Sequence, residues 1–201
     1  MIASQTTECS CKHIVSVSLG SSERNAKSTL QLKGQTFIIE RLGTDGNLQK
    51  ARQLLEELDG RVDALGLGGT DLYVYAGGRR YTFRESAKLI ENVKNTPVLD
   101  GSGLKNSLER ILINRLAADK IIDFQGKKVL MVCGVDRFGM AEALVANGAD
   151  VTFGDLIFGL NWDHPIKSLQ TLDSFAKLLA PLLTKLPVRW FYPMGAKQSE
   201  R

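Results

Sequence analysis

The chain has 201 residues, of which 43% are hydrophobic and 24% charged, and its formal net charge is +4. This composition is ordinary for a globular protein of one or two domains. Lysines and arginines are scattered among acidic residues, whereas a nucleic-acid-binding protein usually concentrates them on one stretch or face. No apolar run approaches the roughly 20 residues that span a bilayer. We therefore expect neither a nucleic-acid partner nor a membrane partner.

The polar N-terminus, residues 1–12, lacks the apolar core of a signal peptide. We predict that it is disordered and that the protein is cytoplasmic. Three cysteines without regular spacing do not indicate a disulfide framework. The two histidines, His13 and His164, come without a third candidate ligand, so we predict no metal site.

Residues 13–125 mix hairpin signals with helical ones. In chain order the patterns predict strands over 14–19, 29–32 and 36–42, a helix over 48–58, strands over 62–67, 72–75 and 80–83, a helix over 85–95, a strand over 97–99 and a helix over 104–116. Lys33-Gly34 and Gly77-Gly78 are typical of turns in β-hairpins. Residues 62–67 are nearly all apolar, as expected of a buried parallel strand. We therefore predict an α/β domain with a mixed sheet over 13–125.

From Gly126 onward strands and helices alternate. The patterns predict strands over 129–133, 151–153 and 188–192, and helices over 139–147 and 166–183. Such alternation predicts a parallel sheet with helices on both faces. We therefore place a boundary near Gln125-Gly126 and predict a partial Rossmann-like βαβ domain over 126–201.

Three strands are fewer than a dinucleotide-binding domain normally has. Either this half-domain is complete in itself, or more chain follows, or a partner supplies the missing part. The aromatic run Trp190–Tyr192 is a candidate core strand or, if it is exposed, a contact in a homo-oligomer.

A glycine turn follows the first strand of this second domain. In a Rossmann unit three glycines permit a tight turn, the approach of a pyrophosphate and close packing of helix on strand, and the helix N-terminus stabilises the phosphate charge. Gly134 and Gly139 stand at the outer positions, but Asp136 stands at the middle one. Its carboxylate would obstruct and repel a phosphate. Arg137 would offset this by pairing with the phosphate or with Asp136 itself.

Asp155 lies about 20 residues beyond Gly134, where an acidic residue accepts a hydrogen bond from the ribose 2′-hydroxyl. Because an aspartate there disfavours a 2′-phosphate, this window predicts NAD rather than NADP. The candidate cofactor-binding residues are Gly134, Arg137, Gly139 and Asp155. The same residues also suit a βαβ unit that binds no nucleotide.

Asp100 follows a short predicted strand and precedes Gly101, Gly103 and a helix. Ligands bind at the carboxyl ends of strands in open α/β sheets, and a carboxylate there can orient or deprotonate a hydroxyl. The alternative is that Asp100 only caps the helix that begins near Leu104.

The order of these elements resembles the shikimate/quinate dehydrogenase family, and the whole chain is similar to a prokaryotic group labelled quinate 5-dehydrogenase. The segments that carry the resemblance are Asp100-Gly101-Ser102-Gly103, Gly126-Lys127-Lys128-Val129-Leu130 and Gly148-Ala149. Bifunctional folate and methanopterin dehydrogenases have a related plan.

The resemblance implies a substrate domain, then a dinucleotide domain, and hydride transfer between NAD and a small hydroxy or keto acid. It implies that Asp100 is the catalytic aspartate. The family's upstream Asn-Val-Thr-x-Pro-x-Lys segment is absent from the equivalent region, Gly66–Asp71, and Lys105 is the candidate replacement for its lysine. Ser16-Val17-Ser18 matches the family's Ser-x-Ser substrate motif. The other expectations are a non-enzymatic ligand-sensing or assembly domain, and a non-redox enzyme.

Overall fold

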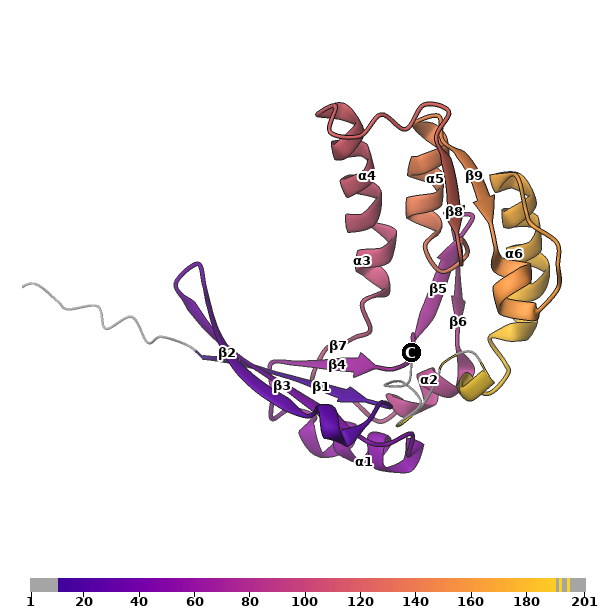
Figure 1. The fold of residues 1–201 in the computed structure, drawn as a ribbon. Coiled ribbons are helices and arrows are strands. Elements are labelled where there is room, and N and C mark those ends of the chain that lie inside the picture. The colour runs from indigo at the N-terminus through magenta and orange to yellow at the C-terminus, as the bar shows by residue number, and fades with distance from the viewer. Residues whose placement is uncertain (1–10, 191, 193–194, 196–201) are drawn as a thin grey trace, which may run out of the picture. The chain divides into compact units, whose positions relative to one another are not determined.

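The computed structural model describes residues 11–190, 192 and 195, which fold as two compact units (Figure 1). Unit 1 comprises residues 1–70, 88–99 and 192–201, and unit 2 comprises residues 71–87 and 100–191. The chain therefore passes between the units after residues 70, 87, 99 and 191. The boundary predicted near Gln125-Gly126 lies inside unit 2.

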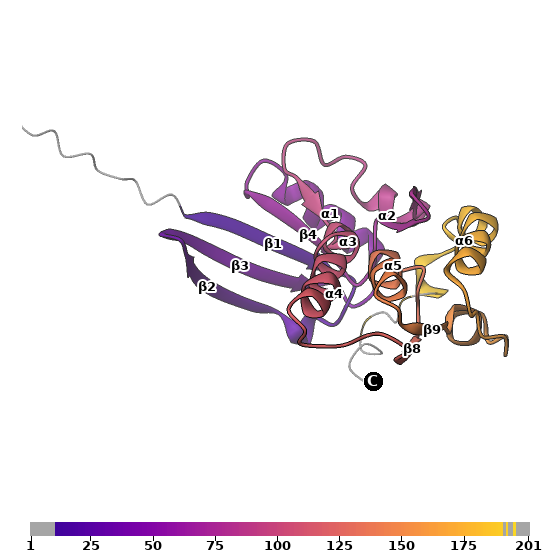
Figure 2. The ribbon, with the colours of Figure 1, turned by 90° about the horizontal axis from the view of Figure 1, so that it is seen from above.

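Unit 1 is built on a five-stranded sheet with the strand order β2-β3-β1-β4-β7. Its strands are β1 (Lys12–Ser18), β2 (Ala26–Leu32), β3 (Gln35–Gly43), β4 (Ala64–Gly68) and β7 (Val98–Leu99). β2 runs antiparallel to β3, and the other neighbours are parallel (Figure 2). The structure thus confirms a mixed sheet in a mixed α/β chain.

The β2–β3 hairpin follows from its two-residue turn. Lys33 and Gly34 have φ values of 50° and 78°, the left-handed conformation that both central residues of a type I′ turn require. Leu32 consequently pairs with Gln35. A short 3-10 helix, η1 (Ser22–Arg24), leads from β1 into this hairpin.

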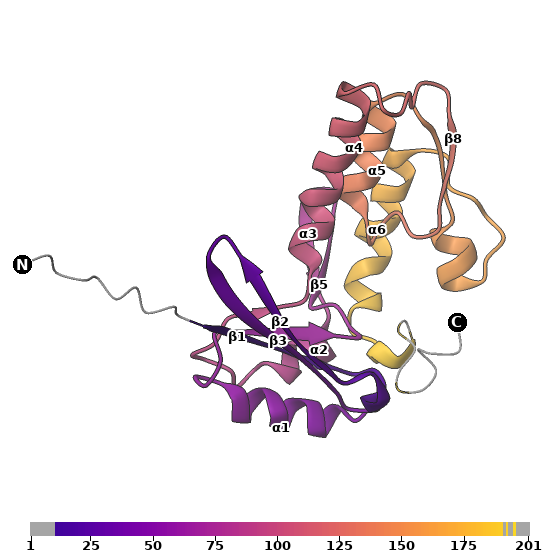
Figure 3. The ribbon, with the colours of Figure 1, turned by 60° about the vertical axis from the view of Figure 1, so that its left-hand side comes forward.

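Helix α1 (Leu48–Leu58) lies along one face of the unit 1 sheet (Figure 3). The side chain of Asn47 accepts a hydrogen bond from the Lys50 N–H and starts the helix. Ala51 and Leu55 are fully buried. On β1 and β4 every second residue is a buried apolar one, as a strand packed on one face requires: Val15, Val17, Leu65 and Leu67.

Unit 2 combines a hairpin, a parallel strand pair and several helices. Its strands are β5 (Tyr73–Ala76) and β6 (Arg79–Thr82), which are antiparallel, and β8 (Lys128–Met131) and β9 (Asp150–Phe153), which are parallel. Its helices are α3 (Ser102–Asn106), α4 (Leu108–Ala118), α5 (Phe138–Ala146) and α6 (Leu169–Leu183), with the short turns η2 (Asp155–Gly159) and η3 (Val188–Trp190). Helix α2 (Arg84–Leu89) leads from unit 2 back into unit 1.

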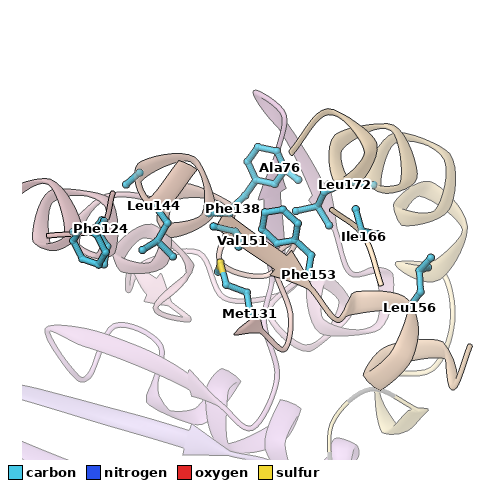
Figure 4. Packing of buried hydrophobic residues seen from close by; sticks show 14 residues of the cluster. Ala76, Phe124, Met131, Phe138, Leu144, Val151, Phe153, Leu156, Ile166 and Leu172 are labelled. Atoms are coloured by element: carbon cyan, nitrogen blue, oxygen red, sulfur yellow. The ribbon is translucent and has the colours of Figure 1, made fainter. Parts of the chain in front are cut away.

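The core of unit 2 gathers on one face of the β8–β9 pair (Figure 4). Phe153 on β9, Phe138 on α5 and Leu172 on α6 are buried in it. On β8, Met131 is buried whereas Leu130 is 60% exposed. The predicted parallel sheet with helices on both faces is therefore, in the described residues, a two-stranded pair that is packed on one face.

The helix predicted over 85–95 is shorter in the structure, where α2 ends at Leu89. The carboxylate of Asp59 accepts hydrogen bonds from the backbone N–H groups of Lys94, Asn95 and Thr96 at 2.7–2.9 Å. These donors are therefore not available to an extended helix. The contact spans more than 30 residues of sequence, so helical periodicity does not show it.

The helix predicted over 104–116 consists of α3 and α4, which are separated at Ser107 (φ −109°, ψ −66°). Ser107 donates its hydroxyl to the Gly103 carbonyl. Four apolar residues at helical spacing on this stretch are each more than half exposed: Leu104, Leu108, Ile111 and Leu112.

The strand predicted over 188–192 was also wrong. Val188–Trp190 form the 3-10 turn η3, whose Val188 N–H donates to the Glu85 carboxylate. Trp190 is exposed, and Phe191 lies outside the described residues.

Of the predicted disordered N-terminus, residues 1–10 lie outside the described part of the chain. Lys12 is already part of β1, and its Nζ lies 2.7 Å from Asp63 Oδ1. Among the described residues, no helix combines the length and the apolar character that crossing a bilayer requires.

Replacing Gly134 by alanine should destabilise unit 2. A Cβ at this position would lie 2.6 Å from Phe153 Cδ1 and 2.8 Å from Leu172 Cδ2, and such overpacking costs about 1–3 kcal/mol. Urea unfolding followed by tryptophan fluorescence measures this, since Trp162 and Trp190 both belong to unit 2.

The matched control is Gly103→Ala in helix α3. A Cβ there meets no atom within 4 Å, and alanine stabilises a helix relative to glycine by up to about 1 kcal/mol. The two variants should therefore move the unfolding midpoint in opposite directions. Equal midpoints would contradict the packing at Gly134.

Candidate functional site

The acidic and basic side chains singled out in the sequence meet inside unit 2, in two neighbouring groups. The first group surrounds Asp100 and Lys105, at the start of α3. The second surrounds Gly134 and Asp155, at the carboxyl ends of β8 and β9.

Asp100 closes the turn that leads into α3. Its Oδ2 lies 2.5 Å from the Leu72 nitrogen and 2.6 Å from Ser102 Oγ, and its Oδ1 accepts the Ser102 N–H at 3.0 Å. Gly101 takes the left-handed conformation that this turn needs (φ 84°). Burial alone would raise the pKa of Asp100, but the hydrogen bonds from Ser102 and Leu72 outweigh it and lower the pKa. Asp100 is thus an anionic acceptor that holds the turn.

Lys105 bridges two carboxylates. Its Nζ lies 2.8 Å from Asp71 Oδ2 and 2.8 Å from Asp136 Oδ1. The side chains of Lys105, Asp71 and Asp136 are 22%, 9% and 26% exposed. Burial by itself would lower the pKa of Lys105, but the hydrogen bonds to Asp136 and Asp71 outweigh it and raise the pKa. The cluster therefore holds a firmly protonated ammonium between two acceptors.

A small cavity of about 10 Å³ lies beside this cluster, which is room for about one water molecule. It is lined by Tyr73, Val74, Tyr75, Ser102, Lys105, Asn106, Asp136 and Phe138. Asn106 Oδ1 is buried, and no donor of the described residues reaches it. A hydroxyl or water in the cavity is the kind of group that this oxygen accepts from.

The glycine turn is tied to the end of β9 by the carboxylate of Asp155. Asp155 Oδ2 accepts the Gly134 N–H at 2.9 Å, and Oδ1 accepts the Val135 N–H at 2.9 Å. Two successive N–H groups that converge on one anion form a small anion-binding concavity. Here the protein's own carboxylate binds in it.

The other residues of the turn point elsewhere. Asp136 is held by Lys105, and the guanidinium of Arg137 pairs with Glu109. Gly139 lets α5 approach α3, because a Cβ there would lie 2.8 Å from the Asn106 carbonyl oxygen. The outer glycines of the window, Gly134 and Gly139, are thus both required by packing.

Cys133 lies next to the Asp155 carboxylate, with its Sγ 3.5 Å from Oδ1. Although Cys133 as a residue is exposed, desolvation of its sulfur and the charge of Asp155 raise the pKa of the thiol to about 12. A thiol with such a pKa stays protonated near neutral pH, which makes it a poor nucleophile.

The structure brings together Asp155 with Gly134, and Lys105 with Asp136. The guanidinium of Arg137 pairs with Glu109 and not with Asp136. Sequence reasoning missed Asp71 as the partner of Lys105. Its signal was present, since Asp71 follows the Gly68-Gly69-Thr70 run at the carboxyl end of β4, where ligand-binding groups often lie.

The Ser16-Val17-Ser18 segment lies on β1 and belongs to unit 1, whereas the two groups belong to unit 2. Ser18 Oγ accepts hydrogen bonds from the Gly20 N–H at 3.1 Å and from the Arg41 guanidinium at 3.0 Å. These contacts hold the loop that follows β1, which accounts for the buried Ser18 without a ligand.

Comparison with known families gives two matches, one after the other along the chain. Residues 13–100 match a domain of unknown function, DUF8753, and residues 103–201 match a second domain of unknown function, DUF8754. The chain is similar to both. Each match covers less than half of the chain, and the two adjoin at the Asp100-Gly101-Ser102 turn. No curated protein and no solved structure matches the chain.

Replacing Lys105 by methionine should destabilise unit 2. Asp71 and Asp136 would keep their negative charges at partly buried positions and would lose the ammonium group that bridges them. Breaking a buried ion pair costs about 3–5 kcal/mol, and the partial exposure here reduces the expected loss to about 1–3 kcal/mol. Urea unfolding followed by tryptophan fluorescence measures it.

Arg115→Met is the matched control. Arg115 pairs with Asp119 on the surface of α4, and its side chain is 73% exposed. Removal of such a pair changes stability by no more than about 0.5 kcal/mol. If Lys105→Met and Arg115→Met unfold at the same urea concentration, the ion cluster has no structural role.

The contribution of Asp100 to stability should disappear in acid. Its pKa in the folded protein lies below the ordinary value of 3.8, so its stabilising effect is present above that value and is lost as the pH falls through the folded-state pKa. The difference in free energy of unfolding between the wild type and Asp100→Asn should therefore be largest near neutral pH and shrink below about pH 4. Asp163→Asn, in an exposed loop, controls for the loss of one charge. A difference that stays constant from pH 7 to about pH 3 would refute the assignment.

Proposed function

We propose that this chain is an NAD-dependent oxidoreductase of the shikimate/quinate dehydrogenase type that acts on a small hydroxy or keto acid. In this proposal β8, α5 and β9 form a Rossmann-like dinucleotide-binding unit. The observation that carries it is the position of Asp155, whose carboxylate at the end of β9 lies against the glycine turn that follows the parallel neighbour β8.

Asp155 suits the adenosine ribose. The two backbone N–H groups orient its carboxylate and use one site on each oxygen, and the Cys133 thiol lies 3.5 Å from Oδ1. Because a carboxylate has about four acceptor sites in all, Oδ2 keeps a site that would accept from the ribose 2′-hydroxyl. A 2′-phosphate would be repelled by the same charge, which supports NAD over NADP.

The phosphate side of the unit also fits. The carboxylate of Asp136, which was expected to repel a phosphate, accepts a hydrogen bond from Lys105. Helix α5 begins without a side-chain cap, so its first N–H groups offer donors and the positive end of the helix dipole. Because Arg137 pairs with Glu109, we assign the phosphate contacts to backbone N–H groups rather than to its guanidinium.

The acid–base group of the proposed reaction is Lys105 rather than Asp100. Bound NAD would supply the hydride acceptor for a carbinol carbon. Lys105 would donate a hydrogen bond to the substrate oxygen and, in the reducing direction, its proton, while Asp71 orients the ammonium. Asp100 would position α3 through Ser102 and the Leu72 N–H.

In this arrangement the lysine and the aspartate come from the opposite segments of the chain to those that supply them in the family that the sequence resembles. There the lysine comes from the upstream segment and the aspartate from the Asp-Gly-x-Gly turn. Here the aspartate, Asp71, comes from the upstream segment and the lysine, Lys105, follows the turn, so a lysine–aspartate pair still forms. The cavity beside Lys105 has room for about one water molecule, so a substrate requires its lining side chains to move.

A second candidate is a non-enzymatic ligand-sensing or assembly domain that retains the βαβ unit for its fold. Three observations favour it: packing explains Gly134 and Gly139, Asp155 already binds the N–H groups of the turn, and the cavity is small. Cofactor binding separates the two candidates.

Calorimetric titration of the whole chain with NAD and NADP tests the proposal. We expect NAD to bind, NADP to bind more weakly, and Asp155→Asn to weaken NAD binding on the order of tenfold, because a charge-assisted hydrogen bond is lost. The control is Asp150→Asn, which changes an exposed aspartate at the start of β9 and should leave NAD binding unchanged. Absence of heat with millimolar NAD would reject the dehydrogenase and leave the non-enzymatic candidate.

A further inference from the structure

An aromatic segment of unit 2 follows Asp155. It comprises residues 156–165, and its large exposed side chains are Phe158, Leu160 and Trp162. Leu156 is buried and anchors its start. Its end is anchored as well, because Ile166 and Phe153 exchange backbone hydrogen bonds at 2.8 and 3.0 Å. The segment is therefore fixed at both ends while it exposes aromatic rings.

Phe158 is the member of this segment that lies against the strand ends. A Cβ built on Gly154 would lie 2.5 Å from Phe158 Cδ2 and 3.4 Å from the Val132 carbonyl oxygen. The ring thus rests on the backbone of the residue before Asp155, beside the end of β8, and Phe158 is still 57% exposed. By contrast, the ring of Trp162 is already stacked on His164, with 5.5 Å between centroids.

We propose that Phe158 is the stacking platform for the adenine base of a nucleotide ligand. The inference rests on the proposed function, in which Asp155 accepts from the ribose 2′-hydroxyl. Adenine is bonded to C1′, the carbon next to the one that carries this hydroxyl, so the base must lie close to the Asp155 carboxylate. Phe158 contacts the residue adjacent to Asp155 and presents an exposed aromatic side chain.

The side chains of Phe158 and Asp155 favour a nucleobase over an anionic ligand. A phenyl ring stacks on any nucleobase through dispersion and needs no charge. The carboxylate of Asp155 next to it accepts hydroxyl donors and repels anionic groups. The two together suit an adenosine moiety with a free 2′-hydroxyl, and Gly154 is the residue whose missing side chain lets the ring lie there.

The test is calorimetric titration of the full chain with AMP, and with nicotinamide mononucleotide as the half of NAD that lacks adenine. The variants are Phe158→Leu, which keeps an apolar side chain without a ring, and Phe158→Tyr, which keeps the ring. Leu160→Ala, an exposed apolar residue of the same segment, is the matched control. Because Phe158 is more than half exposed, both substitutions at this position should leave unit 2 folded.

We expect Phe158→Leu to weaken AMP binding on the order of tenfold, the size of one base–aromatic stack. Phe158→Tyr and Leu160→Ala should bind AMP as the wild type does, and binding of nicotinamide mononucleotide should be the same in all four proteins. AMP binding that Phe158→Leu leaves unchanged overturns the platform.

The outcomes separate this inference from the dehydrogenase itself. A wild type that binds NAD but not AMP overturns the platform and retains the dehydrogenase. AMP binding that depends on Phe158, without any binding of NAD, supports the platform and rejects the dehydrogenase. Self-association that Phe158→Leu abolishes would show that a second copy of the chain covers the ring, which also overturns the platform.

Discussion

The candidate site of unit 2 depends on two hydrogen bonds, which the N–H groups of Gly134 and Val135 donate to the carboxylate of Asp155. They tie the turn after β8 to the end of β9, and so determine the direction in which the chain enters α5. With the turn held in this way, Asp136 reaches Lys105 and Gly139 lies against the Asn106 carbonyl. The same carboxylate would meet the ribose in the proposed function. One side chain therefore has a structural role and a candidate binding role.

Lys105 connects this turn to the rest of unit 2 through charge. It pairs with Asp136 and at the same time with Asp71. One ammonium between two carboxylates leaves a net charge of −1, so Lys105 weakens the repulsion that Asp136 would exert on a phosphate in the proposed function and does not cancel it. Because its pKa is raised, Lys105 carries a proton at neutral pH, which is the form that the proposed reaction needs in the reducing direction. In this arrangement Asp100 acts through the turn that it holds.

Elements whose signals are local were predicted well from the sequence. The Lys33-Gly34 turn, the helix over 48–58 and the β8–α5–β9 order depend on neighbours in sequence, and the structure contains all three. Elements decided by distant contacts were predicted poorly. Asp59 binds the N–H groups of residues 94–96, at the end of the longer helix that was predicted, and Glu85 binds the Val188 N–H in a segment that was predicted as a strand. A pattern in a short window contains no information about such partners.

The candidate site divides in the same way. From residue spacing alone, Gly134 and Asp155 were expected at the ends of two neighbouring strands, and Asp100 at a helix entry, because strand and helix periods determine where a turn occurs. Only the tertiary structure decided that Asp71 pairs with Lys105, that Arg137 pairs with Glu109 and that Asp155 already binds the turn. These pairings join residues 20 to 34 positions apart, so they form only when helices and strands pack. The sequence determined which charges are present, and packing determined which of them meet.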